Sequence, residues 1–81
     1  MFKIIVWGDD GLEATRFQGD NLYDLVLKLN IYKIKNFLQL HAVNFYQNDE
    51  PPNEEVWREY NNMSYKLMPL AKKMVAMGED F

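Results

Sequence analysis

The sequence predicts an α+β domain in which a small three-stranded antiparallel sheet carries two helices on one face, in the order ββαβα. Three patterns favour this class. They are a short β-branched and aromatic run at the start, an amphipathic segment in the middle, and a long helical repeat in the last third. A chain of 81 residues is expected to form one domain, residues 1–81.

The first two strands are expected to form a hairpin. Residues 2–7 are rich in β-branched and aromatic side chains and precede a glycine, which is typical of a strand. Residues 8–11, Gly-Asp-Asp-Gly, have turn chemistry, and no further Asp or Asn spacing supports a calcium loop. Residues 12–17 can then pair back on the first strand.

An amphipathic helix follows the hairpin. Asn21 is a good N-cap, and apolar residues recur at helical spacing from Leu22 to Leu29. We expect this helix to end near Asn30, because asparagine tolerates the left-handed conformation found at helix C-termini.

Residues 31–46 fit two patterns. The alternation typical of a strand occurs at Leu38, Leu40 and Ala42. Helical spacing is matched by Ile34, Phe37, Leu38, His41 and Phe45. A strand over residues 37–46 is favoured, because a hairpin needs a third strand before its sheet has a stable hydrophobic face. A helix over residues 34–46 is the alternative.

A long helix is predicted at the C-terminal end. The residues that share one face at 4-3-4-3 spacing are Val56, Tyr60, Met63, Leu67, Leu70, Met74 and Met77. From the N-cap Asn53 to Met77 this helix would be about 37 Å long, at 1.5 Å per residue. Pro69 lies inside it and predicts a kink rather than a split, because Met68 is a poor N-cap for a new helix.

Composition and charge exclude several classes of protein. The absence of cysteine excludes a disulfide framework and a thiolate metal site. The net charge of −3 argues against a general nucleic-acid binder. We expect a cytoplasmic protein, because no secretory signal and no apolar stretch of about 20 residues is present.

Acidic and aromatic residues gather where the long helix begins. Residues 49–59 contain five carboxylates, and the only basic residue among them is Arg58. Carboxylates near a helix N-terminus are favourable locally, but together with exposed aromatic rings they also suit a basic partner surface. The predicted partner-binding residues are Glu54, Glu55, Trp57, Arg58 and Tyr60.

No catalytic residue, metal ligand or cofactor site is predicted. The single serine, Ser64, lies in the middle of the long helix rather than on an exposed sharp turn. The favoured function is a non-enzymatic protein–protein interaction module. In size, acidity and lack of catalytic groups the chain is similar to small phage-encoded inhibitors of host enzymes, which implies an inhibitor or adaptor that docks on another protein.

Two other functions stay open. The apolar seam of the long helix could pair with a second copy and form a structural or regulatory homodimer. The one basic and aromatic cluster could make a weak contact with single-stranded nucleic acid through Lys28, Tyr32, Lys33 and Lys35.

Overall fold

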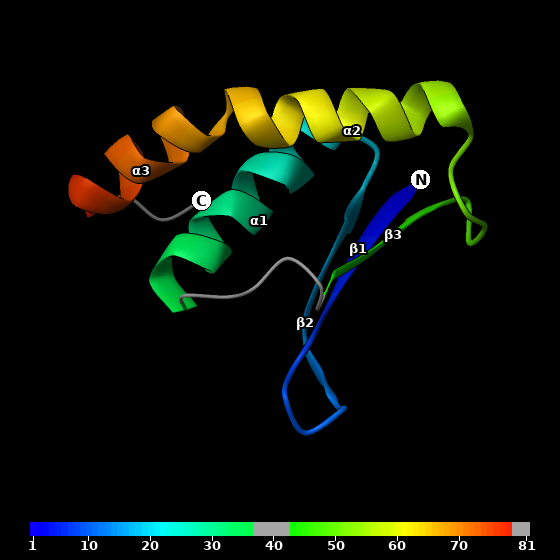
Figure 1. The fold of residues 1–81 in the computed structure, drawn as a ribbon, viewed down its shortest axis with the longest axis horizontal. Helices are drawn as coiled ribbons and strands as arrows, with labels where there is room; N and C mark the ends of the chain where they lie inside the picture. The colour runs from blue at the N-terminus through cyan, green and yellow to red at the C-terminus, as the bar shows by residue number, and fades with distance from the viewer. Residues whose placement is uncertain (37–42, 79–81) are drawn as a thin grey trace.

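A computed structural model describes residues 1–36 and 43–78, and Figure 1 shows its fold. Strands β1 (Phe2–Trp7), β2 (Glu13–Gly19) and β3 (Val43–Gln47) form one antiparallel sheet in the order β2-β1-β3. The predicted α+β class and three-stranded sheet are therefore confirmed. Residues 37–42, where the predicted third strand begins, lie outside the described residues.

The first helix is longer than predicted. Helix α1 spans Leu22–Asn36, so the expected end near Asn30 is wrong. Asn30 is 0% exposed, and its Nδ2 atom donates a hydrogen bond to the backbone oxygen of Ser64 at 3.1 Å. This side chain therefore serves a contact between helices, and the apolar residues that follow it extend the buried face of α1.

The predicted long helix is present as two consecutive helices. Helix α2 spans Glu54–Lys66 and helix α3 spans Met68–Ala76, and we call them together the rod. Only Leu67 separates them, and its φ of −88° and ψ of −5° stay close to helical values. Its amide donates to the Met63 oxygen at 2.8 Å, and its carbonyl accepts from Ala71 at 2.9 Å.

The interruption follows from Pro69 in the first turn of α3. Proline has no amide hydrogen, and its ring crowds the carbonyl four residues earlier, so the axis must bend there. Figure 1 shows α3 turning away from the line of α2. Where one kinked helix was predicted at Pro69, the structure has a break of one residue at Leu67.

The core lies between the sheet and α1, and the rod packs mainly on α1 (Figure 1). Ile4 and Val6 of β1 are fully buried against this helix layer. At 1.5 Å per residue the rod is about 35 Å long, which matches the longest dimension of the molecule, 35 × 29 × 19 Å. The rod therefore lies across the whole body of the protein.

Candidate functional site

A groove with a volume of about 570 Å³ lies between β3 and the start of α2. Its walls are residues 43–46 of β3, the pair Pro51 and Pro52, and Glu54 and Trp57 of α2. Consecutive strand residues point to opposite faces of a sheet, so a groove lined by four of them must run along a strand edge. Since β1 occupies one edge of β3, this is the other edge, which pairs with no described strand. We call it the edge groove.

Trp57 is more exposed than Phe45 and Tyr46, the other aromatic residues that line the edge groove among the described residues. Its side chain is 45% exposed, yet its ring stacks on Phe45 at 5.8 Å and on Tyr60 at 5.5 Å between centroids. Phe45 and Tyr60 stack on each other at 4.5 Å and are both buried. The indole is thus held in one orientation while much of its surface faces solvent. Contact with a partner would therefore cost little rotamer entropy of the Trp57 side chain.

The local sequence places Trp57 over the end of the sheet. After β3 the chain turns through Asn48 and Asp49, both at positive φ (53° and 63°). The amide of Gln47 donates to the Glu50 oxygen at 2.8 Å and closes this turn. The Asn53 side chain then accepts a hydrogen bond from Val56 at 2.9 Å, which starts α2 as an N-cap.

The surface near the edge groove, from Asp49 to Glu59, is acidic and exposed to solvent, and we call it the rim. Lys3 binds Asp49 at 2.9 Å and, through this hydrogen bond and its charge, lowers the pKa of the Asp49 carboxyl. Arg58 pairs with Glu54 at 3.3 Å, one helical turn away, with both side chains largely exposed. Glu50, Glu55 and Glu59 are exposed as well, so the start of α2 and the turn before it carry an excess of negative charge. Glu54 lines the groove with Trp57, whereas Glu55 and Glu59 lie about 160° around α2 from Trp57.

The predicted partner-binding residues fall into two groups. Glu54 and Trp57 line the edge groove, and Glu54, Glu55 and Arg58 line an adjoining hollow of about 470 Å³. Tyr60 is 8% exposed, and its ring supports Trp57 from beneath. Four of the five residues therefore share one exposed end of the rod, and the fifth lies under them.

Sequence reasoning missed the strand edge and the two prolines as parts of this site. Pro51 and Pro52 are not among the predicted partner-binding residues, and the edge of β3 depends on strand order. A pair of prolines between a strand and a helix is the one signal in the sequence that would have pointed to this wall.

The basic and aromatic cluster of α1 is divided in the structure. Lys33 is 7% exposed and faces the rod, whereas Lys35 is exposed. Tyr32 is half-buried and meets the ring of Phe17 edge-on at 6.1 Å. Because Lys33 lies about 100° or more around the helix from Lys28, Tyr32 and Lys35, the four do not form one surface.

The apolar seam of the rod is covered unevenly. Tyr60 and Leu67 are buried, whereas Leu70 is 36% and Met77 62% exposed. Tyr65, beside the seam, is exposed too. The middle of the rod thus packs inside this domain, and its C-terminal part keeps apolar surface in solvent.

The described residues contain neither a candidate metal site nor a candidate membrane-spanning helix. No group of three or more His, Cys, Asp or Glu in residues 1–36 and 43–78 has the arrangement of a metal site. None of the helices in these ranges combines the length and apolar character that crossing a bilayer requires. Comparison of the chain with protein-family models, with curated proteins and with solved structures gave no match.

Proposed function

We propose that this chain is a non-enzymatic protein-binding module that takes an extended, basic segment of a partner protein into the edge groove. The observation that carries the proposal is the half-exposed indole of Trp57, fixed by stacking beside a strand edge that no strand of the described residues pairs with. Such a module acts as an inhibitor or as an adaptor, depending on what the bound segment does in its own protein.

The edge of β3 supplies the main-chain part of the binding. An unpaired edge offers a row of N–H and C=O groups that an extended segment can join as a further strand. Glu50 already pairs with the outward amide and carbonyl of Gln47. The bound segment would therefore match residues 43–46, about four residues or about 14 Å at 3.4 Å per residue.

Side chains of the groove supply the selectivity. The indole of Trp57 and the rings of Pro51 and Pro52 form an apolar wall opposite the strand edge. Along an added strand every second side chain would point to this wall, so one apolar or arginine side chain could rest on the Trp57 face.

The acidic rim favours a basic segment. Within residues 49–59 the carboxylates outnumber the basic residues by five to one, and Lys3 is the only additional cation in an ion pair with them among the described residues. Exposed charges of this kind raise the association rate and select the sign of the partner, and added salt weakens their effect.

Selection from a randomised peptide library tests the proposal. We expect the enriched peptides to carry Lys or Arg and no Pro in the segment that pairs with β3. Binding is measured by the fluorescence anisotropy of a dye-labelled peptide, so that the wild type and a variant without Trp57 are measured in the same way. Trp57→Ala should weaken binding about 30-fold or more, the effect of losing a hot-spot residue of about 2 kcal/mol.

Matched variants control this experiment. Glu55→Lys should slow association without changing the fold, whereas Lys72→Glu, far along the rod from the groove, should leave association nearly unchanged. Enrichment of acidic peptides, or equal binding by the Trp57→Ala variant, would contradict the proposal.

Self-association is the second candidate, and the exposed Leu70 and Met77 at the end of the rod favour it. In a homodimer these residues would bury each other across a helix pair. Sedimentation over a range of concentrations decides: a mass that doubles with concentration and returns to the monomer value in Met77→Lys supports the dimer, and a constant monomer mass excludes it.

A further inference from the structure

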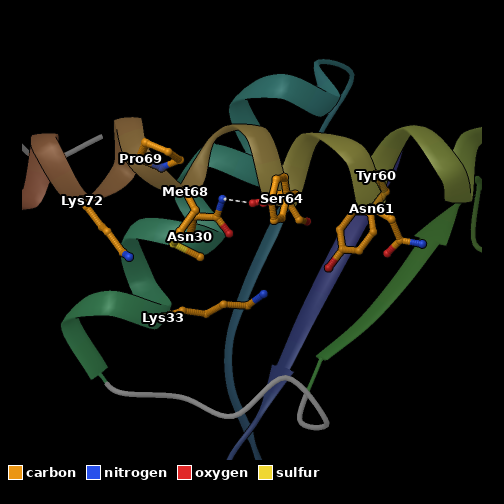
Figure 2. A pocket seen from close by; sticks show the side chains of 9 residues that line it. Asn30, Lys33, Tyr60, Asn61, Ser64, Met68, Pro69 and Lys72 are labelled. Carbon is orange, nitrogen blue, oxygen red and sulfur yellow. Dashed lines mark hydrogen bonds between the residues drawn. The ribbon is translucent and has the colours of Figure 1, made fainter.

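A second hollow, separate from the edge groove, lies between α1 and the rod. It has a volume of about 570 Å³, and we call it the inter-helix pocket. Figure 2 shows its polar side chains: Asn30 and Lys33 reach into it from α1, and Tyr60, Ser64 and Lys72 reach toward it from the rod. Met68 and Pro69 add apolar surface beside them. The pocket therefore combines a few polar ends with an apolar wall, as small-molecule sites do.

The first observation that indicates a ligand site is the burial of Lys33. Its side chain is only 7% exposed, and no carboxylate among the described residues lies within ion-pair distance of it. Burial lowers the pKa of its ammonium group, as expected when a cation loses water without gaining a counter-charge. The described residues that line the pocket include a second cation, Lys72, and no acid.

Asn30 is the second, independent sign. It is 0% exposed, and its Nδ2 atom is used by the hydrogen bond to the Ser64 backbone oxygen. Its Oδ1 atom has no hydrogen-bond partner among the described residues. Exchanging the positions of Oδ1 and Nδ2 would not satisfy the oxygen, because Oδ1 would then face the Ser64 carbonyl oxygen, which is also an acceptor. A buried acceptor without a donor is costly, so its natural complement is a donor on a ligand.

We propose that the inter-helix pocket binds a small organic carboxylate that carries a hydrogen-bond donor and an apolar body. The Lys33 ammonium pairs with the carboxylate, the Asn30 Oδ1 atom accepts from the donor, and Met68 and Pro69 cover the apolar part. Lys72 lies at the exposed side and adds positive potential on the way in. A singly charged carboxylate fits better than a phosphate, because one buried ammonium can balance one charge and a second charge would remain desolvated.

The test uses para-hydroxybenzoate as the probe and para-hydroxybenzamide as its neutral counterpart of the same shape. Binding to the whole chain is followed by NMR through the side-chain amide signals of Asn30 and by the shift in melting temperature. We expect para-hydroxybenzoate to move the Asn30 signals in a saturable way. The amide should bind at least about tenfold more weakly, as expected when a charge-assisted hydrogen bond is lost.

Variants of Lys33 separate a binding role from a structural role. Lys33→Met should abolish carboxylate binding and leave the melting temperature equal or higher, because it removes a buried unpaired charge. Lys33→Gln should also lose binding, which keeps the test valid if the methionine variant repacks. Lys28→Met is the matched control, since Lys28 lies on another side of α1 and does not line the pocket.

Several results would overturn the proposal. They are equal binding of acid and amide, unchanged carboxylate binding in Lys33→Met, and binding of inorganic phosphate without binding of the carboxylate. Absence of any saturable change with para-hydroxybenzoate and with hexanoate at millimolar concentration would overturn it too. None of these outcomes bears on the edge groove, because the two sites share no lining residue.

Discussion

The edge groove and the inter-helix pocket have the same volume, about 570 Å³, but opposite charge. The groove is lined by the exposed carboxylate of Glu54 and by the half-exposed Trp57, whereas the described residues that line the pocket include a buried Lys33 and no acid. The parallel rings of Phe45, Tyr60 and Trp57 stand between them, since Trp57 lines the groove and Tyr60 lines the pocket. Volume alone therefore does not say what a hollow binds.

The depth of the charges decides how each site would work. Carboxylates on the groove rim are surrounded by water, so they guide a partner and add little to its affinity. The Lys33 side chain is largely buried and has no counter-charge among the described residues, so a counter-charge there would be held more strongly than one on the rim. The rings of Phe45, Tyr60 and Trp57 form an aromatic wall shared by the two sites. We expect substitutions in this shared wall to have large effects on stability and binding, and substitutions in the rim to have small ones.

Removing the shared wall should have the largest effect. Phe45→Ala deletes a buried ring at the centre of the aromatic stack and should lower the free energy of unfolding by about 3–5 kcal/mol, as measured by urea denaturation. Phe45→Leu, which nearly keeps the volume, should cost less than about 1.5 kcal/mol but release Trp57 and weaken peptide binding. Unchanged peptide binding in Phe45→Leu would show that the stack does not position the indole.

Loosening the joint of the rod should affect the pocket and spare the groove. Leu67→Ala truncates a buried side chain between α2 and α3 and should cost about 2–5 kcal/mol. Leu70→Ala is the control, because Leu70 is partly exposed and should cost less than half as much. Carboxylate binding should fall in Leu67→Ala while peptide binding persists, and a melting temperature equal to wild type would place Leu67 outside the core.

Lys33 and Tyr60, the two buried titratable groups with shifted pKa values among the described residues, should change the free energy of unfolding in opposite directions at alkaline pH. Burial lowers the pKa of Lys33 below its usual 10.5, so the unfolded chain holds that proton more tightly and stability rises as pH approaches 10.5. Burial raises the pKa of the Tyr60 hydroxyl above 10.0, so stability is lost as pH climbs through that raised value. Lys72 faces the same pocket but is exposed.

Single variants separate these two parts. Lys33→Met should lack the rise and Tyr60→Phe should lack the fall, when urea unfolding is measured at several alkaline pH values. Identical profiles for wild type and Lys33→Met would mean that the Lys33 ammonium keeps its water in the folded state.

The smallest effect is expected at the rim. Arg58→Ala removes an exposed ion pair with Glu54 one helical turn away, so stability should change by less than about 0.5 kcal/mol. The rim becomes more acidic, and stopped-flow measurements should show faster association of a basic peptide at low salt. Slower association in this variant would instead make Arg58 a direct contact of the partner.

The strands and helices could largely be predicted from local patterns. β1 coincides with the β-branched run of residues 2–7, and α2 begins after its predicted N-cap, Asn53. These features depend on neighbours in the sequence: turn residues, a capping side chain and an apolar period. The end of α1 was predicted wrongly at Asn30, because the favourable cap chemistry of that residue gave way to a contact with Ser64, 34 residues away.

The candidate site was only partly predictable for the same reason. The sequence located Trp57 and the acidic residues around it, because composition and helical spacing are visible in one dimension. It did not reveal that Tyr60 would be buried beneath Trp57, or that the neighbouring edge of β3 would pair with no described strand. Those facts depend on how α2 lies against the sheet.

By itself, then, the sequence determined the class of fold, the rod as long as the molecule, and the acidic aromatic end of that rod. Only the tertiary structure decided that Trp57 faces solvent above a buried Tyr60. It also decided that Lys33 is buried near an Asn30 oxygen that has no partner among the described residues. The physical reason is that periodicity is a property of neighbours along the chain. Burial and unmet hydrogen bonds arise between segments that meet only when the chain is folded.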